Sequence, residues 1–205
     1  MPHWIGVLLI VSLGLFMMPK VTEFITLSFT ARGWKRFAEE NGLDFERGSF
    51  RLLGYSVPHE VKGIYKGRSV IGIQSHEDIP HTFGALWLSH LRVSSTVRPN
   101  SRARFSHNWL WMFRRKKSGI GDPVFERFIV VDSQPISYAR RFLEDPAIRR
   151  LVKSLISPVL GPVRELRITK SGTIHLSNGR ILTAKQLKKR FDILCDIAQR
   201  VEEVN

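Results

Sequence analysis

The first eighteen residues limit most strongly what this chain can fold into. From Trp4 to Met18 the sequence reads WIGVLLIVSLGLFMM, a run of fifteen residues without a charged side chain. A helix of this length covers about 22 Å, and the flanking residues together with a snorkelling Lys20 bring it toward the roughly 30 Å of a bilayer core. We therefore expect residues 1–20 to form a single transmembrane anchor.

Two other interpretations of the apolar run are open. A cleaved signal peptide has a positive segment before the run and small residues at its end. Here no Lys or Arg precedes Trp4, and the run ends in Phe16-Met17-Met18-Pro19. A core helix of a soluble protein is the other alternative, but the run lacks the polar stripe that a packed surface helix shows.

The charges around the run predict its orientation. Lys20, Arg32, Lys35 and Arg36 follow the apolar run, whereas no basic residue precedes it. Because the side richer in Lys and Arg stays in the cytoplasm, we expect a single-pass protein of the cell inner membrane with its C-terminal domain in the cytoplasm. Cys195 is the lone cysteine, so an intramolecular disulfide is impossible and nothing in the cysteine content indicates an oxidising compartment.

The net charge requires an anionic neighbour. The chain carries a formal charge of +14, and residues 58–118 contribute +8 of it, since they hold eleven Lys or Arg against three Asp or Glu. Acidic lipid headgroups next to an anchored domain account for this excess most simply, at about 1 kcal/mol per basic residue near the surface. Nucleic acid is the other polyanion that such a charge fits.

Periodicity predicts an α+β domain after the anchor. Residues 21–42 read as a helix that leaves the membrane and ends at Asn41-Gly42. Residues 43–205 read as one cytoplasmic α+β domain, a mostly antiparallel β-sheet of six to eight strands with helices near 135–157 and 184–203 packed on it. The expected strands begin with 43–51 and continue with a hairpin of 61–65 and 68–73 around Lys66-Gly67. Thr183 and Gln186 predict a capping box at the start of the last helix.

One predicted strand, residues 104–114, combines aromatic and basic residues. Its aromatic side chains alternate and then meet the basic run Arg114–Lys117. The aromatic residues either pack in the core or lie with the basic run on the headgroup layer. Trp34 in the exit helix likewise either lies in the interface or packs on the domain. The residues expected to contact the membrane or an acidic partner are Lys20, Trp34, Lys35, Arg36, Arg104, Trp109, Trp111, Arg114, Arg115, Lys116 and Lys117.

A short signature gives the chain a resemblance to other proteins. The motif consists of Gly121, Asp122, Pro123, Phe125 and Phe128, with Glu126 between the two phenylalanines. Two earlier segments, 42–45 (GLDF) and 63–68 (GIYKGR), go with it. With these, the chain resembles a family of uncharacterised bacterial proteins that have an N-terminal membrane segment and one α+β domain. The resemblance implies this architecture and membrane attachment, and it brings no catalytic residues.

The sequence asks for no enzyme. No phosphate-binding loop, nucleophile elbow, cysteine pair or metalloprotease helix occurs, and we expect no catalytic residue, cofactor or metal. The best metal candidate is the stretch from His76 to His81 with His90 nearby, which we interpret as a polar turn between strands. We expect an accessory or scaffolding subunit that docks on anionic lipids or on a larger membrane complex. A single-stranded nucleic-acid-binding module and a hydrolase with a dispersed site around His76, His81 or His90 are the alternatives.

Overall fold

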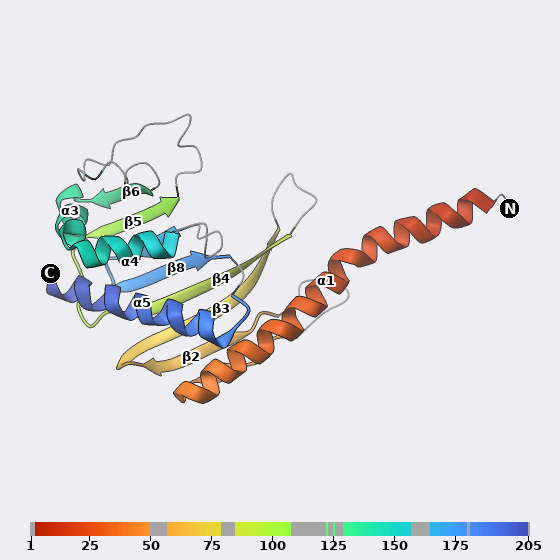
Figure 1. Ribbon diagram of the computed structural model, residues 1–205, viewed down its shortest axis with the longest axis horizontal. Helices are drawn as coiled ribbons and strands as arrows, with labels where there is room; N and C mark the ends of the chain where they lie inside the picture. The colour runs from red at the N-terminus through yellow and green to blue at the C-terminus, as the bar shows by residue number, and fades with distance from the viewer. Residues whose placement is uncertain are drawn as a thin grey trace.

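The computed structural model describes residues 3–49, 57–78, 85–107, 122, 125, 129–156, 165–179 and 181–204. Within these ranges the side chains of some residues are not described, among them most of those between residues 5 and 20. The fold consists of one antiparallel sheet, a layer of helices on it, and a long N-terminal helix that extends beyond both (Figure 1).

Among the described residues, the sheet has eight strands in the order β1-β2-β3-β4-β8-β7-β5-β6, and every neighbouring pair is antiparallel. The strands are β1 (Asp44–Glu46), β2 (Glu60–Tyr65), β3 (Arg68–Asp78), β4 (Ala85–Ser94), β5 (Arg102–His107), β6 (Ile129–Gln134), β7 (Glu165–Ile168) and β8 (Thr173–Asn178). The expected fold class is confirmed at this level, an α+β fold with an antiparallel sheet and C-terminal helices.

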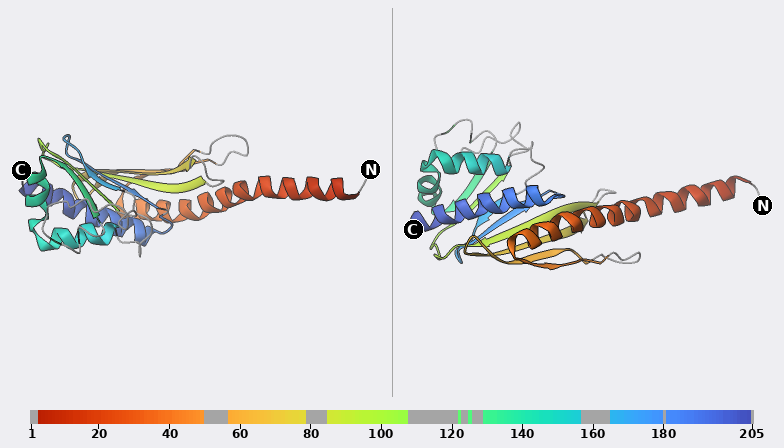
Figure 2. Two further views of the ribbon diagram at one scale, coloured as in Figure 1. Left: turned by 90° about the horizontal axis from the view of Figure 1, so that it is seen from above. Right: turned by 60° about the horizontal axis from the view of Figure 1, so that its bottom comes forward.

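The helices cover one face of this sheet (Figure 2). They are α1 (His3–Asn41), α3 (Ile136–Glu144), α4 (Pro146–Ile156) and α5 (Ala184–Glu203). Alternate residues of the strands turn toward them, which is why Val70, Leu91, Phe105, Leu166 and Leu176 are all buried. The result is a two-layer domain with one core between sheet and helices.

The central hairpin matches its prediction. Lys66 and Gly67 join β2 to β3, and both have positive φ angles of 50° and 74°. This is the backbone of a two-residue turn whose twist suits paired strands, and glycine adopts it without a steric cost. Further along β3, a Cβ on Gly72 would come within 3.2 Å of the Trp34 ring, so this glycine leaves room for the tryptophan.

Helix α1 is longer than the sequence suggests. It runs without a break for 39 residues through Pro19, so the predicted anchor and the predicted exit helix belong to one helix. It ends at Asn41, whose side-chain amide donates to the Phe37 carbonyl (2.7 Å), and Gly42 follows with a φ of 64°, as expected for the end of a helix. The C-terminal part of α1 lies on the sheet beside α5, and its N-terminal part extends beyond the domain (Figure 1).

Side-chain caps mark the starts of α4 and α5, whereas α3 begins after Pro135 without one. Thr183 and Gln186 form the capping box at the start of α5. The helical segment expected near 135–157 is two helices, which meet at Asp145; its side chain accepts from the Ala147 N–H (2.7 Å). Ile136 at the start of α3 is exposed, whereas Tyr138 of the same helix is fully buried.

Two expected strand boundaries are wrong. The first strand was expected to span residues 43–51, but β1 has three residues, since its partner β2 pairs only Glu60 to Lys62 with it. The polar segment from His76 to Asp78 was expected to be a turn. It continues β3 instead, because its backbone pairs with β4 from Trp87 to Ala85.

Candidate membrane-facing surface

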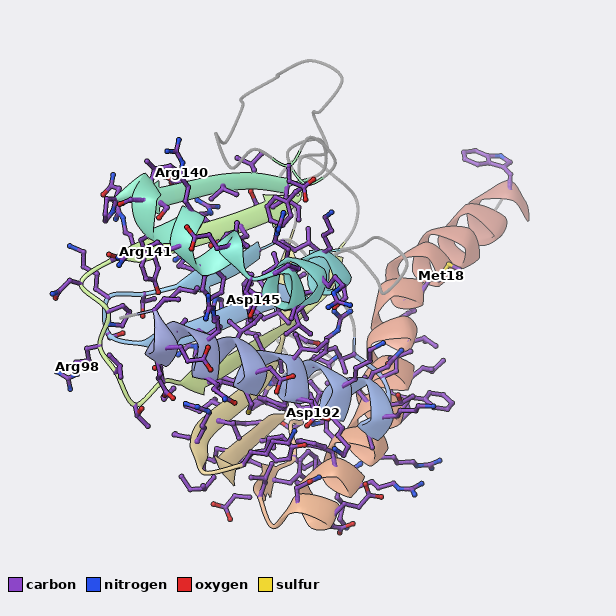
Figure 3. All side chains as sticks on the ribbon, turned by 60° about the vertical axis from the view of Figure 1, so that its left-hand side comes forward. Met18, Arg98, Arg140, Arg141, Asp145 and Asp192 are labelled. Atoms are coloured by element: carbon purple, nitrogen blue, oxygen red, sulfur yellow. The ribbon has the colours of Figure 1, made fainter. Side chains whose placement is uncertain are left out.

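The extended part of α1 presents apolar side chains to solvent. Among its described side chains, the exposed large ones are Trp4, Met18, Val21, Phe24, Ile25 and Phe29. Met18 lies on the part of the helix that extends beyond the domain (Figure 3), and 69% of its surface is accessible. A row of exposed apolar residues of this length is unusual for a surface in water and marks a contact with lipid or with another chain.

In the described part of the chain, no helix combines the length and the hydropathy that a membrane crossing needs. Most side chains of the run from Trp4 to Met18 lie outside the described residues, so the anchor stays a prediction.

The other half of α1 packs on the sheet through a stripe of buried residues. Leu27, Thr30, Trp34 and Phe37 recur at helical spacing and have almost no accessible surface. The Phe37 ring stacks on Phe191 of α5 with centroids 5.5 Å apart. This stripe fixes which side of α1 faces the sheet.

Trp34 is the predicted contact residue that the structure contradicts. It is fully buried, and its indole N–H donates to the Ile181 carbonyl (2.9 Å). A large aromatic ring with its polar atom satisfied inside the domain belongs to the core. Trp34 therefore cannot contact lipid or a partner in this fold.

A buried histidine attaches α1 to the sheet at the point where the helix leaves the domain. His59 Nδ1 accepts from the Gly48 N–H (2.8 Å), so the neutral ring carries its proton on Nε2, which donates to the Leu27 carbonyl (2.8 Å). Burial lowers the pKa of His59, although the Leu27 carbonyl acts in the opposite direction. The ring is therefore neutral at physiological pH, and its two nitrogens link Leu27 of α1 to Gly48.

Lys35 and Arg36 lie on the exposed side of α1, as a contact surface requires. Each forms an ion pair one turn further along, Lys35 with Glu39 (3.5 Å) and Arg36 with Glu40 (2.7 Å). Pairs of this kind are solvated and weak, so a stronger anion can replace the carboxylate.

The strand register shows which end of the sheet lies toward the free half of α1. Asp78 pairs with Ala85, Ser89 with Asn178, and His107 with Ile129, so these strand ends share one end of the sheet. Helix α1 extends past the same end (Figure 1). The segment between His107 and Ile129, which carries Arg114 to Lys117, therefore starts and finishes at the end of the sheet next to the free half of α1.

Arg104 belongs to a different surface, the face of the sheet opposite the helices. Successive cross-strand partners form one row there, from β2 to β6: Lys62, Ile71, Arg92, His175, Arg167, Arg104 and Asp132. Arg104 and Arg167 both pair with Glu165, at 2.7 and 2.6 Å. Sequence reasoning did not find this row, because it requires the order of the strands and not only their alternation.

His175 in this row is held in its neutral form. Partial burial lowers its pKa to about 4, and His90, Arg92 and Arg167 add to the shift. The His90 and His175 rings stack with centroids 5.5 Å apart. His90 of the predicted metal candidate thus packs on a second imidazole on the face of the sheet opposite the helices.

The signature residues that the structure describes have structural roles. Asp122 Oδ1 accepts from the Phe125 N–H (2.9 Å), and Phe125 is fully buried. Asp122 Oδ2 lies 3.6 Å from Arg149 and 3.5 Å from Lys153 of α4. The motif thus attaches the segment before β6 to α4.

Several predicted site residues lie outside the described residues or have side chains that do. These are Lys20, His76, His81, Trp109, Trp111, Arg114, Arg115, Lys116, Lys117, Gly121, Pro123 and Phe128. Among the described residues, no group of three or more His, Cys, Asp or Glu side chains could hold a metal ion. Cys195 is buried in α5, and burial raises the pKa of its thiol, which suits a core residue.

Comparison with known proteins gives a fold and no family. No protein-family model matches the chain, and no curated protein matches it significantly. Among solved structures, the crystal structure of the mycobacterial trehalose monomycolate transport factor A, TtfA, is similar. The two chains are 14% identical with a TM-score of 0.51, and the match covers 85% of this chain and 93% of the other. At this identity the likeness shows a shared fold.

Proposed function

We propose that the protein is a non-enzymatic, single-pass protein of the bacterial inner membrane. Its N-terminal helix is the anchor, and its basic domain docks on the anionic cytoplasmic leaflet and on a larger membrane complex. The observation that carries the proposal is the free half of α1, a continuous helix whose sequence from Trp4 to Met18 is uncharged and whose described large side chains are exposed.

The residues that flank the basic segment support the lipid contact. Arg114 to Lys117 belong to a connection that starts and finishes at the end of the sheet next to the free half of α1. With α1 in the bilayer, this end of the domain is the one nearest the headgroups. A basic residue near an anionic leaflet contributes about 1 kcal/mol.

The basic residues at the opposite end support a second, acidic partner. Arg98, Arg140 and Arg141 lie at the end of the domain away from the free half of α1 (Figure 3). The ten residues of β4 separate the two ends by about 33 Å, whereas the membrane field decays within about 8–10 Å at physiological salt. Lipids therefore do not account for these arginines, and we assign them to an acidic surface of a membrane complex.

The similar solved structure is compatible with an accessory role. That protein is named as a transport factor in mycobacteria, which fits a bacterial protein that assists a process at a membrane. No described feature of this chain requires chemistry of its own.

Membrane extraction tests the anchor. We expect the full chain to stay in the membrane pellet after carbonate treatment and Ile10→Arg to shift it into the supernatant, because a charge at the centre of a span costs about 2.5–3.5 kcal/mol. Gln199→Arg, which adds the same charge to an exposed position of α5, is the matched control and should stay in the pellet. Recovery of the unchanged chain in the supernatant would refute the anchor.

Cysteine labelling tests the orientation. In a Cys195→Ser background, Pro2→Cys should react with a membrane-impermeant maleimide in intact spheroplasts. Lys170→Cys, in the exposed turn between β7 and β8, should react only after lysis. Labelling of Lys170→Cys from outside would place the domain on the other side of the membrane.

A further inference from the structure

A groove between α1 and the start of α5 is suited to hold a small molecule. It has a volume of about 730 Å³, which is the size of pockets that hold small ligands. Its apolar lining comes from Phe29, Gly33, Leu182 and Ala184. Phe29 and Leu182 are both exposed, so the apolar lining is accessible from outside.

Cations surround this apolar lining. Arg32 and Arg36 of α1 and Lys185 and Lys188 of α5 line the groove, together with the acidic Glu40. Arg36 pairs with Glu40, and Lys188 pairs with Asp192 (3.1 Å).

Two of these four cations have no ion pair among the residues that the structure describes. Within the described part of the chain, neither Arg32 nor Lys185 has an ion pair. Both flank the point where the two helices meet, since a Cβ on Gly33 would lie 2.4 Å from the Leu182 carbonyl oxygen. An anion placed at this crossing would therefore find a cation on each side.

An apolar stripe of α1 leads into the groove. Met18, Val21, Ile25 and Phe29 follow one another at intervals of three and four residues and are all exposed. The next positions on this stripe are Arg32 and Arg36, in the groove itself. The expected membrane boundary lies at Lys20, and Phe29 is about 13 Å further along the helix. The stripe therefore connects this boundary with the cations of the groove.

We propose that this groove binds one anionic phospholipid. The phosphate lies between Arg32 and Lys185, and the acyl chains lie along the apolar stripe toward the bilayer. We assign a phospholipid because the apolar stripe of α1 is followed by Arg32 and Lys185, for which the described residues offer no ion pair. This order matches that of the acyl chains and the phosphate in a phospholipid. The proposal rests on the proposed membrane attachment, which places the groove within reach of a lipid.

A lipid count on the full chain tests the groove. The protein, solubilised in a neutral detergent, is titrated with dioleoyl phosphatidylglycerol, and native mass spectrometry counts the lipids that each molecule retains. We expect one retained phosphatidylglycerol, and about tenfold or more weaker binding in the double variant Arg32→Gln/Lys185→Gln, because each loses a charge-assisted contact to phosphate. Phosphatidylcholine in place of phosphatidylglycerol should be retained less.

Matched variants separate the groove from the general positive charge. Lys170→Gln/Lys189→Gln removes the same charge from two exposed positions outside the groove, one of them on α5, and we expect it to retain the lipid. Phe29→Ser leaves every charge in place but removes the apolar contact, and it should weaken binding as well. The melting temperature of each variant shows that it is folded.

Three results would overturn the proposal. They are equal retention by the groove variant and the control variant, equal loss by both, and full competition by glycerol phosphate, which has no acyl chain. The carbonate extraction described above distinguishes failure of the groove proposal from failure of the anchor proposal. A chain that extracts freely but binds lipid through Arg32 and Lys185 would refute the anchor alone, and a chain that resists extraction but fails the lipid test would refute the groove alone.

Discussion

The crossing of α1 and α5 gives the most direct test of how the N-terminal helix is held on the domain. Gly33 of α1 faces the backbone at the start of α5, where an added Cβ would lie 2.4 Å from the Leu182 oxygen and 3.0 Å from Thr183 Cα. Ordinary contact begins near 3.4 Å, so Gly33→Ala requires the two segments to separate by about 1 Å.

The expected loss of stability combines three contributions. Overpacking against backbone costs about 1–3 kcal/mol. A separation of about 1 Å also breaks the 2.9 Å bond from the Trp34 indole to Ile181, which leaves buried polar atoms unpaired at a cost of about 1–3 kcal/mol. Alanine regains about 1 kcal/mol of helix propensity over glycine. We expect a net loss of about 3 kcal/mol, or about 6–12 °C in melting temperature for a chain of this size.

Thermal unfolding in a nonionic detergent, followed by near-ultraviolet circular dichroism, measures this loss. Gly14→Ala is the matched control, because the same substitution in the same helix meets nothing within 4 Å. We expect that control to melt within about 2 °C of the unchanged protein, since it adds a helix-favouring residue without a clash. A Gly33→Ala protein that melts with the unchanged protein would show that α1 is not held against α5 as described.

Three further changes probe other contacts. Glu202→Gln should lower the free energy of unfolding by about 2–3 kcal/mol, measured by chemical denaturation. Glu202 accepts from both terminal nitrogens of Arg68 (2.5 and 2.9 Å) and from the Thr96 N–H (2.7 Å). An unchanged free energy of unfolding would show that these hydrogen bonds do not stabilise the fold. Thr183→Ala should cost about 1 kcal/mol by the same assay and Thr183→Ser much less, since serine keeps the capping oxygen. Stability should also fall by about 1–2 kcal/mol as the pH drops from 6.5 to 4, since unfolding lets His175 take up a proton that its folded pKa of about 4 excludes, with a discount for its partial solvation. His175→Asn should reduce that slope, and an unchanged slope would contradict the assignment.

Local patterns predicted those parts of the fold that depend on neighbouring residues. The hairpin at Lys66-Gly67, the end of α1 at Asn41 and the capping box at Thr183 each depend on chemistry within a few positions, and all three are confirmed. The extent of β1 and the continuation of β3 through Asp78 depend on what the partner strand offers. A single sequence does not give that information.

The candidate site divides in the same way. Helical periodicity already placed Trp34 and Phe37 on one face of their helix, but it left open whether that face meets lipid or protein. The sheet decides the question, because Gly72 leaves space for the tryptophan. That Arg32 and Lys185 line the same groove was not predictable from the sequence. These residues lie far apart in the chain and come together only where α1 and α5 cross.

The continuity of α1 has a mechanical consequence. No loop separates the segment proposed for the membrane from the segment buried under the sheet, so the domain does not swivel freely at the end of a tether. The helix acts as a lever whose arm from Met18 to Ala38 is about 30 Å long. A change of about 10° in the tilt of the embedded segment would displace Ala38 by about 5 Å. A change in tilt would therefore move the domain.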